Sequence, residues 1–187
     1  AANNADQCLA YLTVTDPNSF CNQAPLAICQ DITVDVDENC QKSITAAEVD
    51  GGSSDPDGDQ IVLSLDQTGP FGLGAHTLTL SISDGLATNN CTATLTVEDN
   101  TAPAVICQDI TIQLDENGLT SIAVNDINNG SSDACGLANL SLDKANFDCS
   151  NTGDNTTTLS ATDLNGNSSS CQATVTVEDD TKPTLTC

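Results

Sequence analysis

The sequence contains no arginine, methionine or tryptophan, and it has one histidine, one tyrosine and three phenylalanines. Its basic residues are three lysines, set against 27 acidic residues, which gives the 187-residue chain a formal net charge of −24. Binding to nucleic acid or to an anionic membrane depends on basic side chains that neutralise phosphates. The composition therefore argues against both partners. No segment approaches the roughly 20 apolar residues of a membrane-spanning helix, so we also expect no membrane insertion.

The scarcity of histidine and aromatic residues also argues against catalysis. A catalytic centre needs several convergent groups, and His76 has no reactive serine or cysteine beside it in the sequence. An acidic chain offers carboxylate pairs of the kind that glycoside hydrolases use. However, the aromatic residues that would form a sugar platform are missing, and no glycine-rich phosphate loop is present. We therefore expect no enzymatic activity.

Cysteine, in contrast, is abundant. The ten cysteines include no closely spaced zinc-type pair, which favours disulfides and an oxidising compartment. The opening residues "AANNADQC" have neither the basic region nor the apolar core of a signal peptide. We therefore interpret the chain as a mature secreted protein or as part of a longer one, located outside the cell or at its surface.

The chain repeats itself. The segment "ICQDITVDVDEN" (28–39) recurs as "ICQDITIQLDEN" (106–117), and "NCTATLTVEDNTAP" (90–103) recurs as "SCQATVTVEDDTKP" (170–183). A weaker copy of the second motif, "QCLAYLTVTDPN", lies at 7–18. Self-similarity at a fixed period indicates an array of similar structural units.

The recurrences define the expected domain boundaries. We interpret residues 1–28 as the end of a preceding repeat plus a linker. Residues 29–106 form the first complete repeat, and residues 107–186 form the second. Cys187 then begins a following repeat, so the sequence is expected to belong to a longer array.

Each repeat carries strand signals and lacks a long helical periodicity. The first contains "ITVDV" (32–36), "SITAAEV" (43–49), "IVLSL" (61–65), "HTLTLSIS" (76–83) and "TATLTV" (92–97). These runs are rich in β-branched residues, many alternate apolar with polar positions, and turn-forming residues separate them. The pattern predicts an all-β fold of tandem Ig-like β-sandwich repeats arranged end to end.

A family resemblance follows from the second repeat. Its segments "GSSDACG" (130–136) and "TDLNGNSSSCQATVTVED" (162–179), with "CQDIT" at the start of both repeats, resemble the hyalin-repeat-like (HYR-like) Ig-like domains of bacterial cell-surface adhesins. The resemblance covers residues 29–186. The first repeat departs from it at "DPDGD" (55–59), a D-x-D-G-D variant closer to cadherin-like repeats.

The resemblance implies a structural or adhesive extracellular module that forms a stiff stalk or filament of a bacterial surface protein, without catalysis. Its partners would be neighbouring repeats of the same array and other copies in a filament. The alternative is a carbohydrate- or protein-binding module of a secreted protein. Repeats that contact mainly their neighbours suit the first role, and the sequence identifies no adhesive target.

The sandwich geometry predicts two disulfides. The first and last strands of such a domain commonly run parallel as neighbours, which places Cys29 near Cys91 and Cys107 near Cys171. Each bond would close a long loop, for which the chain-entropy estimate is roughly 4 kcal/mol of stabilisation.

Six cysteines lie outside that pattern. Cys135 and Cys149 occur only in the second repeat, so we expect them to pair with each other. The other four are Cys8 and Cys187, expected to pair with cysteines of flanking repeats, and Cys21 and Cys40, left either as a pair or as links to another chain.

Acidic and amide residues gather in loops that we expect at the pole where each repeat begins. A Ca²⁺ ion takes 6–8 oxygen ligands and would neutralise such a cluster, which would stiffen the array. The same residues also form hydrated turns, and strands rather than helices flank "DPDGD", unlike an EF-hand. The candidate ligands are Asp16, Asn18, Asp55, Asp57, Asp59, Asp84, Glu98, Asp99, Asn100, Asp133, Asp163, Asn165 and Asn167.

Overall fold

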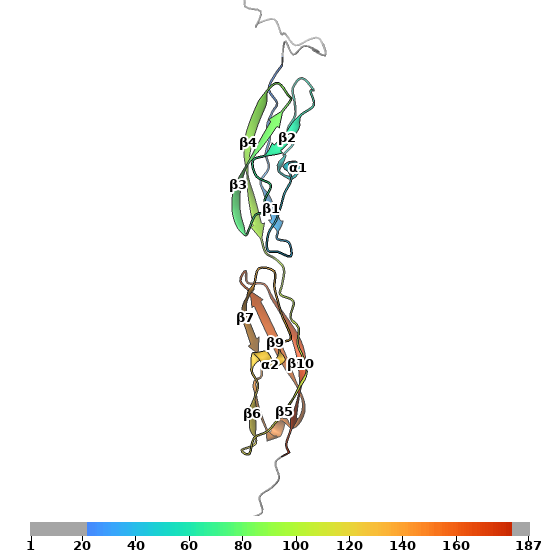
Figure 1. The fold of residues 1–187 in the computed structure, drawn as a ribbon, viewed down its shortest axis with the longest axis vertical. Helices are drawn as coiled ribbons and strands as arrows, with labels where there is room; N and C mark the ends of the chain where they lie inside the picture. The colour runs from blue at the N-terminus through green and yellow to red at the C-terminus, as the bar shows by residue number, and fades with distance from the viewer. Residues whose placement is uncertain (1–21, 181–187) are drawn as a thin grey trace, which may run out of the picture. The chain divides into compact units, whose positions relative to one another are not determined.

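The structure is a computed structural model that describes residues 22–180. It is an all-β protein with two compact units (Figure 1). The described residues up to Asp37 and Gln41–Glu98 form the first unit, and Glu38–Cys40 with the residues from Asp99 onward form the second. The repeat pattern places residues 99–106 at the end of the first repeat, whereas their contacts group them with the second unit. Backbone hydrogen bonds between Ala104 and Ser132 account for this grouping.

The first unit contains a four-stranded sheet in the order β1-β4-β3-β2. Its strands are β1 (Ile32–Asp35), β2 (Val62–Leu65), β3 (Gly74–Ser83) and β4 (Thr88–Glu98). The first and last strands pair in parallel and the other neighbours are antiparallel. In the second half of β3, the alternate residues Leu78, Leu80 and Ile82 are fully buried, as a strand with one face on a core requires.

Isolated bridges form much of the second layer of this sandwich. They join Leu26 to Ser54, Cys29 to Asp50, and Lys42 to Phe71. The core between the two layers consists of Ile44, Val49, Phe71, Leu78, Ala93, Leu95 and Val97.

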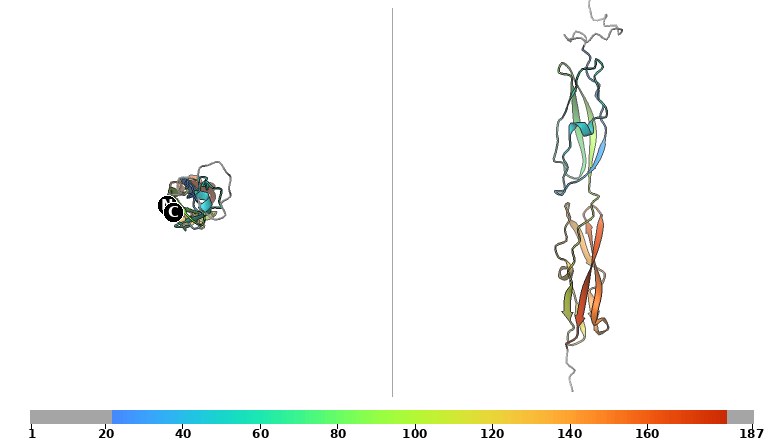
Figure 2. Two further views of the ribbon diagram at one scale, coloured as in Figure 1. Left: turned by 90° about the horizontal axis from the view of Figure 1, so that it is seen from above. Right: turned by 90° about the vertical axis from the view of Figure 1, so that its right-hand side faces the viewer.

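The expected strand at 43–49 is wrong, because its second half is a single helical turn, α1 (Ala46–Val49). Figure 2 shows this turn lying over the face of the sheet, where Val49 joins the core. The carboxylate of Glu48 accepts hydrogen bonds from the Thr45 amide (2.7 Å) and hydroxyl (2.8 Å). This local T-x-x-E bonding favours a helix start and here prevails over the β-branched composition. The Thr45 bonds, the backbone bond first, lower the pKa of Glu48.

The second unit repeats the plan with a sheet in the order β5-β10-β9-β7. These strands are β5 (Ile110–Gln113), β7 (Leu137–Leu142), β9 (Gly153–Asp163) and β10 (Ser168–Glu178). The parallel pair is β5 with β10. The opposite layer contains the two-stranded sheet of β6 (Leu119–Ser121) and β8 (Asn146–Asp148), together with α2 (Val124–Ile127). Each unit is thus a β-sandwich. Among residues 22–180, no helix is long and apolar enough to cross a membrane.

The two disulfides expected from the repeat are present. Cys29 bonds to Cys91 and Cys107 bonds to Cys171, with Cα–Cα distances of 5.7 and 5.9 Å. The parallel pairing of the first and last strands of each unit brings these cysteines together.

The expected Cys135–Cys149 disulfide is wrong. Cys135 bonds to Cys40, with a Cα–Cα distance of 4.9 Å, and Cys149 is an exposed free thiol. Cys135 and Cys149 lie at opposite ends of β9. Gly136, next to Cys135, accepts a backbone hydrogen bond from Leu164, which follows the last residue of β9. Cys149 instead lies shortly before Gly153, the first residue of β9. Eleven residues of strand span about 35 Å, far beyond the roughly 7 Å limit for a disulfide. The expected pairing of Cys40 with Cys21 or with another chain is also wrong, because Cys40 bonds to Cys135. The pairings of Cys8, Cys21 and Cys187 lie outside the described residues.

Candidate metal centre

The hairpin turn between β9 and β10 positions the first candidate ligand, Asp163. Its Oδ1 accepts hydrogen bonds from the backbone amides of Asn165 (2.9 Å) and Asn167 (2.8 Å). Its Oδ2 accepts one from Asn167 Nδ2 at 2.9 Å. These bonds hold the carboxylate in a fixed orientation. They also provide hydrogen-bond partners for a side chain that is only 2% exposed. Burial alone would raise the pKa of Asp163, but the bonds from the side chain and amide of Asn167 and the amide of Asn165 outweigh it and lower this pKa.

A second loop, before β7, supplies Asp133. Its Oδ1 accepts hydrogen bonds from the amides of Cys135 (2.8 Å) and Gly136 (3.1 Å). This local bonding is typical of aspartate in a turn. The loop is further fixed where Leu164 donates a backbone hydrogen bond to Gly136, so the second loop lies against the β9–β10 turn.

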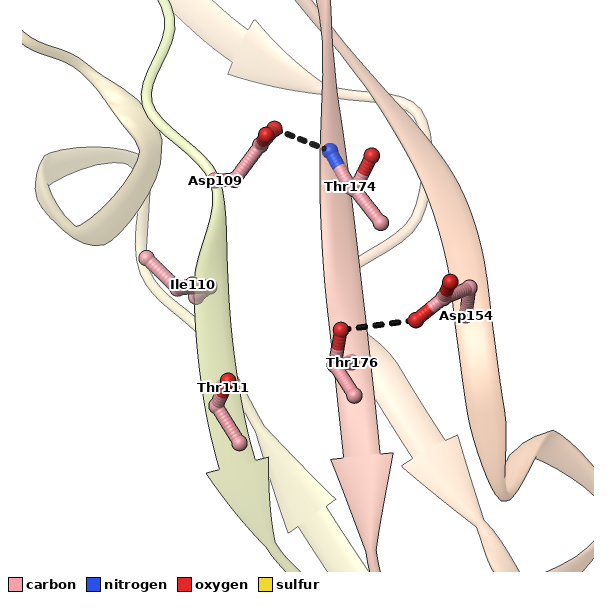
Figure 3. A pocket seen from close by; sticks show the side chains of 6 residues that line it. All are labelled: Asp109, Ile110, Thr111, Asp154, Thr174 and Thr176. Atoms are coloured by element: carbon pink, nitrogen blue, oxygen red, sulfur yellow. Dashed lines mark hydrogen bonds between the residues drawn. The ribbon is translucent and has the colours of Figure 1, made fainter.

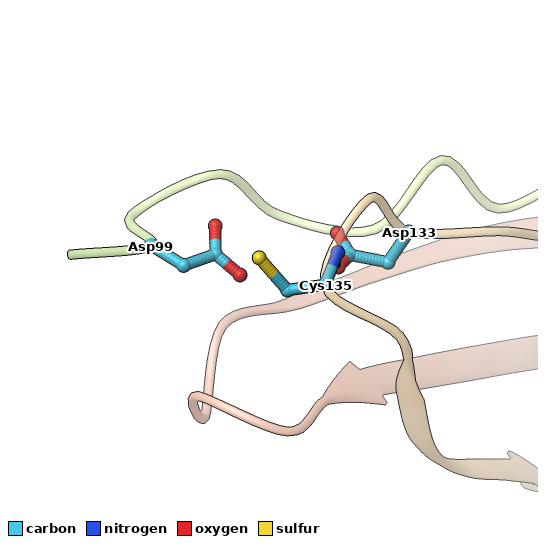
Figure 4. Close-up of side chains that lie close together, drawn as sticks. All are labelled: Asp99, Asp133 and Cys135. Atoms are coloured by element: carbon cyan, nitrogen blue, oxygen red, sulfur yellow. The ribbon is translucent and has the colours of Figure 1, made fainter. Parts of the chain in front are cut away.

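Asp99 completes the group and is its most unusual member. Its side chain is 7% exposed, its Oδ1 accepts a bond from the Thr101 amide at 3.1 Å, and its Oδ2 is buried without a hydrogen-bond partner. The Asn167 side chain, which also binds Asp163, donates to the backbone carbonyl of Asp99 at 2.9 Å. Ligand atoms of Asp99, Asp133 and Cys135 lie within 4.8 Å of one another (Figure 4).

The chemistry of this group fits a hard cation. Cys135 is bonded to Cys40, and a disulfide sulfur is not a thiolate, so the sulfur is no metal ligand. The carboxylates of Asp99 and Asp133 remain. A buried carboxylate oxygen without a partner is costly, and a cation with oxygen ligands would remove this cost at Asp99.

The first unit contains a related but looser arrangement. In the turn between β3 and β4, Asp84 Oδ1 accepts bonds from the amides of Leu86 (2.7 Å) and Ala87 (2.6 Å), as Asp163 does in its own turn. The Ala87 and Leu86 amides, in that order, and the Asn22 side chain lower the pKa of Asp84. Asn22 Nδ2 donates to Asp84 Oδ2 at 3.0 Å. Two oxygens in this region are buried without a partner, Asn22 Oδ1 and Asp55 Oδ2.

The D-x-D-G-D segment forms a hydrogen-bonded loop rather than an array of free carboxylates. Asp55 Oδ1 accepts bonds from the amides of Asp57 (2.8 Å) and Asp59 (3.3 Å). Asp57 Oδ2 accepts a hydrogen bond from the Gln23 amide at 2.7 Å, and Asp57 Oδ1 accepts one from Gln23 Nε2 at 2.8 Å. Asp59 is exposed. Within residues 22–180, these carboxylates and Asp84 do not form a three-ligand group of the kind found around Asp99.

The other candidates have different positions. Glu98, Asn100 and Asn165 are exposed, and Asp16 and Asn18 lie outside the described residues. The sequence reasoning missed Asn22, which the structure places on Asp84. The repeat contained a usable signal, because Asn22 stands seven residues before Cys29 as Asn100 stands before Cys107.

A shallow depression on the outer face of the second sheet is a different feature. It has a volume of about 240 Å³ and is lined by Asp109, Ile110, Thr111, Asp154, Thr174 and Thr176 (Figure 3). Its carboxylates already have partners. Asp109 accepts a bond from the Thr174 amide at 2.6 Å, and Asp154 accepts one from the Thr176 hydroxyl at 2.7 Å. In the first unit Asp31 bonds to Thr94 in the same way, which indicates a structural role in holding the strands.

Comparisons with known proteins add distant likenesses. No protein-family model matches the chain, and no curated protein matches it. Human protocadherin-24 EC1-2 is 14% identical, with a TM-score of 0.43, over 84% of this chain and 100% of that one. Drosophila N-cadherin EC1-4 is 14% identical, with a TM-score of 0.41, over 84% and 50%. An endo-fucoidan hydrolase of glycoside hydrolase family 107 is 14% identical, with a TM-score of 0.32, over 90% of this chain and 30% of that enzyme. These likenesses are too distant to support an inference about function.

Proposed function

We propose that the chain is a non-enzymatic structural or adhesive segment of a stiff extracellular stalk or filament, built from tandem β-sandwich repeats. The observation that carries the proposal is the Cys40–Cys135 disulfide, because its cysteines come from two successive repeats of the sequence. We expect such a bond to restrict the freedom of successive repeats, which would suit a stiff stalk. The three disulfides within residues 22–180 also support an oxidising, extracellular location. The bacterial assignment rests on the HYR-like resemblance of the repeat sequence.

We also propose that Ca²⁺ stabilises the module. Asp99 and Asp133 would hold the ion through their carboxylates in the second unit, and Asp163 and Asn167 would position the chain around it. In the first unit Asp55 and Asn22 would offer their unpartnered oxygens, with Asp84 beside Asn22. The bound ion supplies positive charge that offsets the repulsion between carboxylates.

Calorimetric titration of Ca²⁺ into the metal-stripped chain tests this part of the proposal. We expect Asp99→Asn to weaken binding to the second unit at least tenfold, because it removes the negative charge and keeps the shape. The matched control is Glu116→Gln, which removes one charge from an exposed residue elsewhere in the same unit. At a Ca²⁺ concentration of 100 times Kd, binding would stabilise the unmodified unit by about 2.7 kcal/mol. The calcium proposal is wrong if the metal-stripped chain binds no Ca²⁺ at millimolar concentration and a chelator leaves its melting temperature unchanged.

A further inference from the structure

Cys149 is the free thiol among the described cysteines, and it is exposed. It begins a short 3₁₀ turn, η2 (Cys149–Asn151), directly after β8. The turn is held by its own bonds: Asp148 Oδ1 accepts from the Ser150 amide at 2.8 Å, and Asn151 Oδ1 accepts from the Asp148 amide at 3.0 Å. The thiol is therefore presented on a defined loop.

The turn that follows the first strand is the same in both repeats. After β1, the Asp37 amide bonds to the Gln41 carbonyl at 2.7 Å; after β5, the Asp115 amide bonds to the Leu119 carbonyl at 3.0 Å. In each turn, the residue just before the one whose carbonyl accepts this hydrogen bond has a left-handed backbone. It is Cys40, with φ 57°, in the first turn and Gly118, with φ 73°, in the second. Gly118 therefore occupies the position of Cys40 and lacks its thiol.

The Cys149 side chain fills the place that this glycine leaves. A Cβ atom added to Gly118 would collide with Cys149 Sγ, and the same sulfur lies 3.6 Å from the Gly118 carbonyl oxygen. In the second unit a sulfur thus lies at the turn after the first strand, although it comes from a different residue. At the equivalent turn the sulfur of Cys40 is bonded to Cys135, in the loop before β7.

We propose that Cys149 takes over the role of Cys40 and forms a disulfide with a cysteine in another repeat. The partner is a thiol in a loop equivalent to "DACG" (133–136) in a following repeat, because Cys135 of this chain is already bonded to Cys40. The disulfide that Cys40 makes at the equivalent turn is the observation that points to this partner. The inference rests on the repeat-array part of the proposed function and is independent of calcium.

The bond forms by two thiol–disulfide exchange steps. The Cys149 thiolate attacks a low-molecular-weight disulfide, such as oxidised glutathione, and releases one small thiol. The partner thiolate then attacks the Cys149 sulfur of the mixed disulfide and releases the second. The small disulfide takes up both electrons, and its two thiols carry away the two protons.

A loop transplant tests whether this arrangement can replace Cys40. In a chain with Cys40→Gly, the segment 148–152 replaces Gly72 and Leu73, which follow Phe71 as Asp148 follows Phe147. We expect the transplanted cysteine to bond to Cys135 after refolding in a glutathione redox buffer. Non-reducing peptide mapping reads the connectivity. The matched control carries the same loop with its cysteine changed to serine, and its Cys135 should remain unpaired.

The inference is overturned if Cys135 of the transplanted chain is recovered as a free thiol or a glutathione adduct while Cys29–Cys91 and Cys107–Cys171 are intact. If those two bonds do not form, mapping of the native protein, alkylated at isolation, decides instead. There we expect the Cys149 peptide joined to a "DACG"-type loop, and recovery of Cys149 as a free thiol or on any other cysteine refutes the inference. This readout is connectivity, so the inference can fail while the stalk proposal stands.

Discussion

At the scale of single residues, Thr157 places a polar atom in the core of the second unit. Its side chain is 0% exposed and its hydroxyl has no hydrogen-bond partner. Thr157 faces Ala173 across the strand pair β9–β10. In the first unit, Leu78 faces Ala93 at the corresponding position of β3–β4. The core therefore accepts an apolar residue at this place in the fold.

We expect Thr157→Val to stabilise the second unit, because it removes an unpaired buried hydroxyl and nearly preserves the shape. Leaving such a group unpaired costs about 1–3 kcal/mol, and each kcal/mol raises the melting temperature of a unit of this size by about 4–8 °C. Thermal and urea unfolding measure the change. The control is Thr156→Val on the exposed face of the same strand, which should shift stability by no more than about 0.5 kcal/mol. A destabilised Thr157→Val variant would show that the hydroxyl contributes in a way the structure does not reveal.

The hydrogen bonds to Asp163 and Asp84 predict an acid-dependent stability. Each carboxylate has a lowered pKa in the folded chain. Its stabilising contribution is therefore complete above the unfolded-state value of about 3.9, and it is lost as the pH falls through the lower folded-state pKa. We expect the free energy of unfolding of the metal-free chain to fall steeply below about pH 4. In Asp163→Asn the second unit should be less stable near neutral pH and its acid slope shallower. An unchanged slope would contradict the assignment.

At the scale of elements, the parallel first and last strands carry the bond that closes each unit. In the second unit the Cys107–Cys171 disulfide spans 64 residues, for which the chain-entropy estimate is about 4 kcal/mol. We expect the paired substitution Cys107→Ala/Cys171→Ala to lower the free energy of unfolding of this unit by about that amount. Guanidinium unfolding, followed for each unit separately, measures the loss. The control Cys149→Ser removes a thiol that crosslinks nothing in this unit and should leave the midpoint unchanged. A loss well below 2 kcal/mol would mean that strand pairing alone holds the closure.

The strand sequences alone specified most of the sheet but not the second layer. Alternation in segments such as "HTLTLSIS" assigns Leu78, Leu80 and Ile82 to the core, because a strand has a period of two. The segment 43–49 has a β-branched composition as well, yet Glu48 bonds back to Thr45 and starts a helical turn. The helical turn also places Val49 in the core.

At the scale of the whole molecule, the proposed stalk predicts extended dimensions in solution. A compact globule of 187 residues would have a radius of gyration of about 16 Å. We expect small-angle X-ray scattering with Ca²⁺ to give a clearly larger value and a rod-like distance distribution. Cys40→Ser/Cys135→Ser should broaden that distribution, because the bond between successive repeats is lost. A value near that of a globule would refute the end-to-end arrangement.

The sequence by itself determined the features that recur with its period. The all-β class follows from alternation. The Cys29–Cys91 bond follows from the parallel first and last strands that an Ig-like sandwich implies, and the Cys107–Cys171 bond follows from it by repetition, because both copies must satisfy the same local geometry. The presence of acidic turns at Asp84 and Asp163 follows in the same way, since aspartate caps a turn through its own neighbours.

Only the tertiary structure decided the features that break the period. Cys40 and Cys135 each occur in one repeat alone, and their pairing depends on residues 95 apart in sequence being brought together. The candidate metal centre likewise depends on how deeply Asp99 is buried and on which of its oxygens remains unpartnered. Composition shows that a carboxylate is present. Whether it is hydrated, hydrogen-bonded or left without a partner is set by the packing of three separate loops around it.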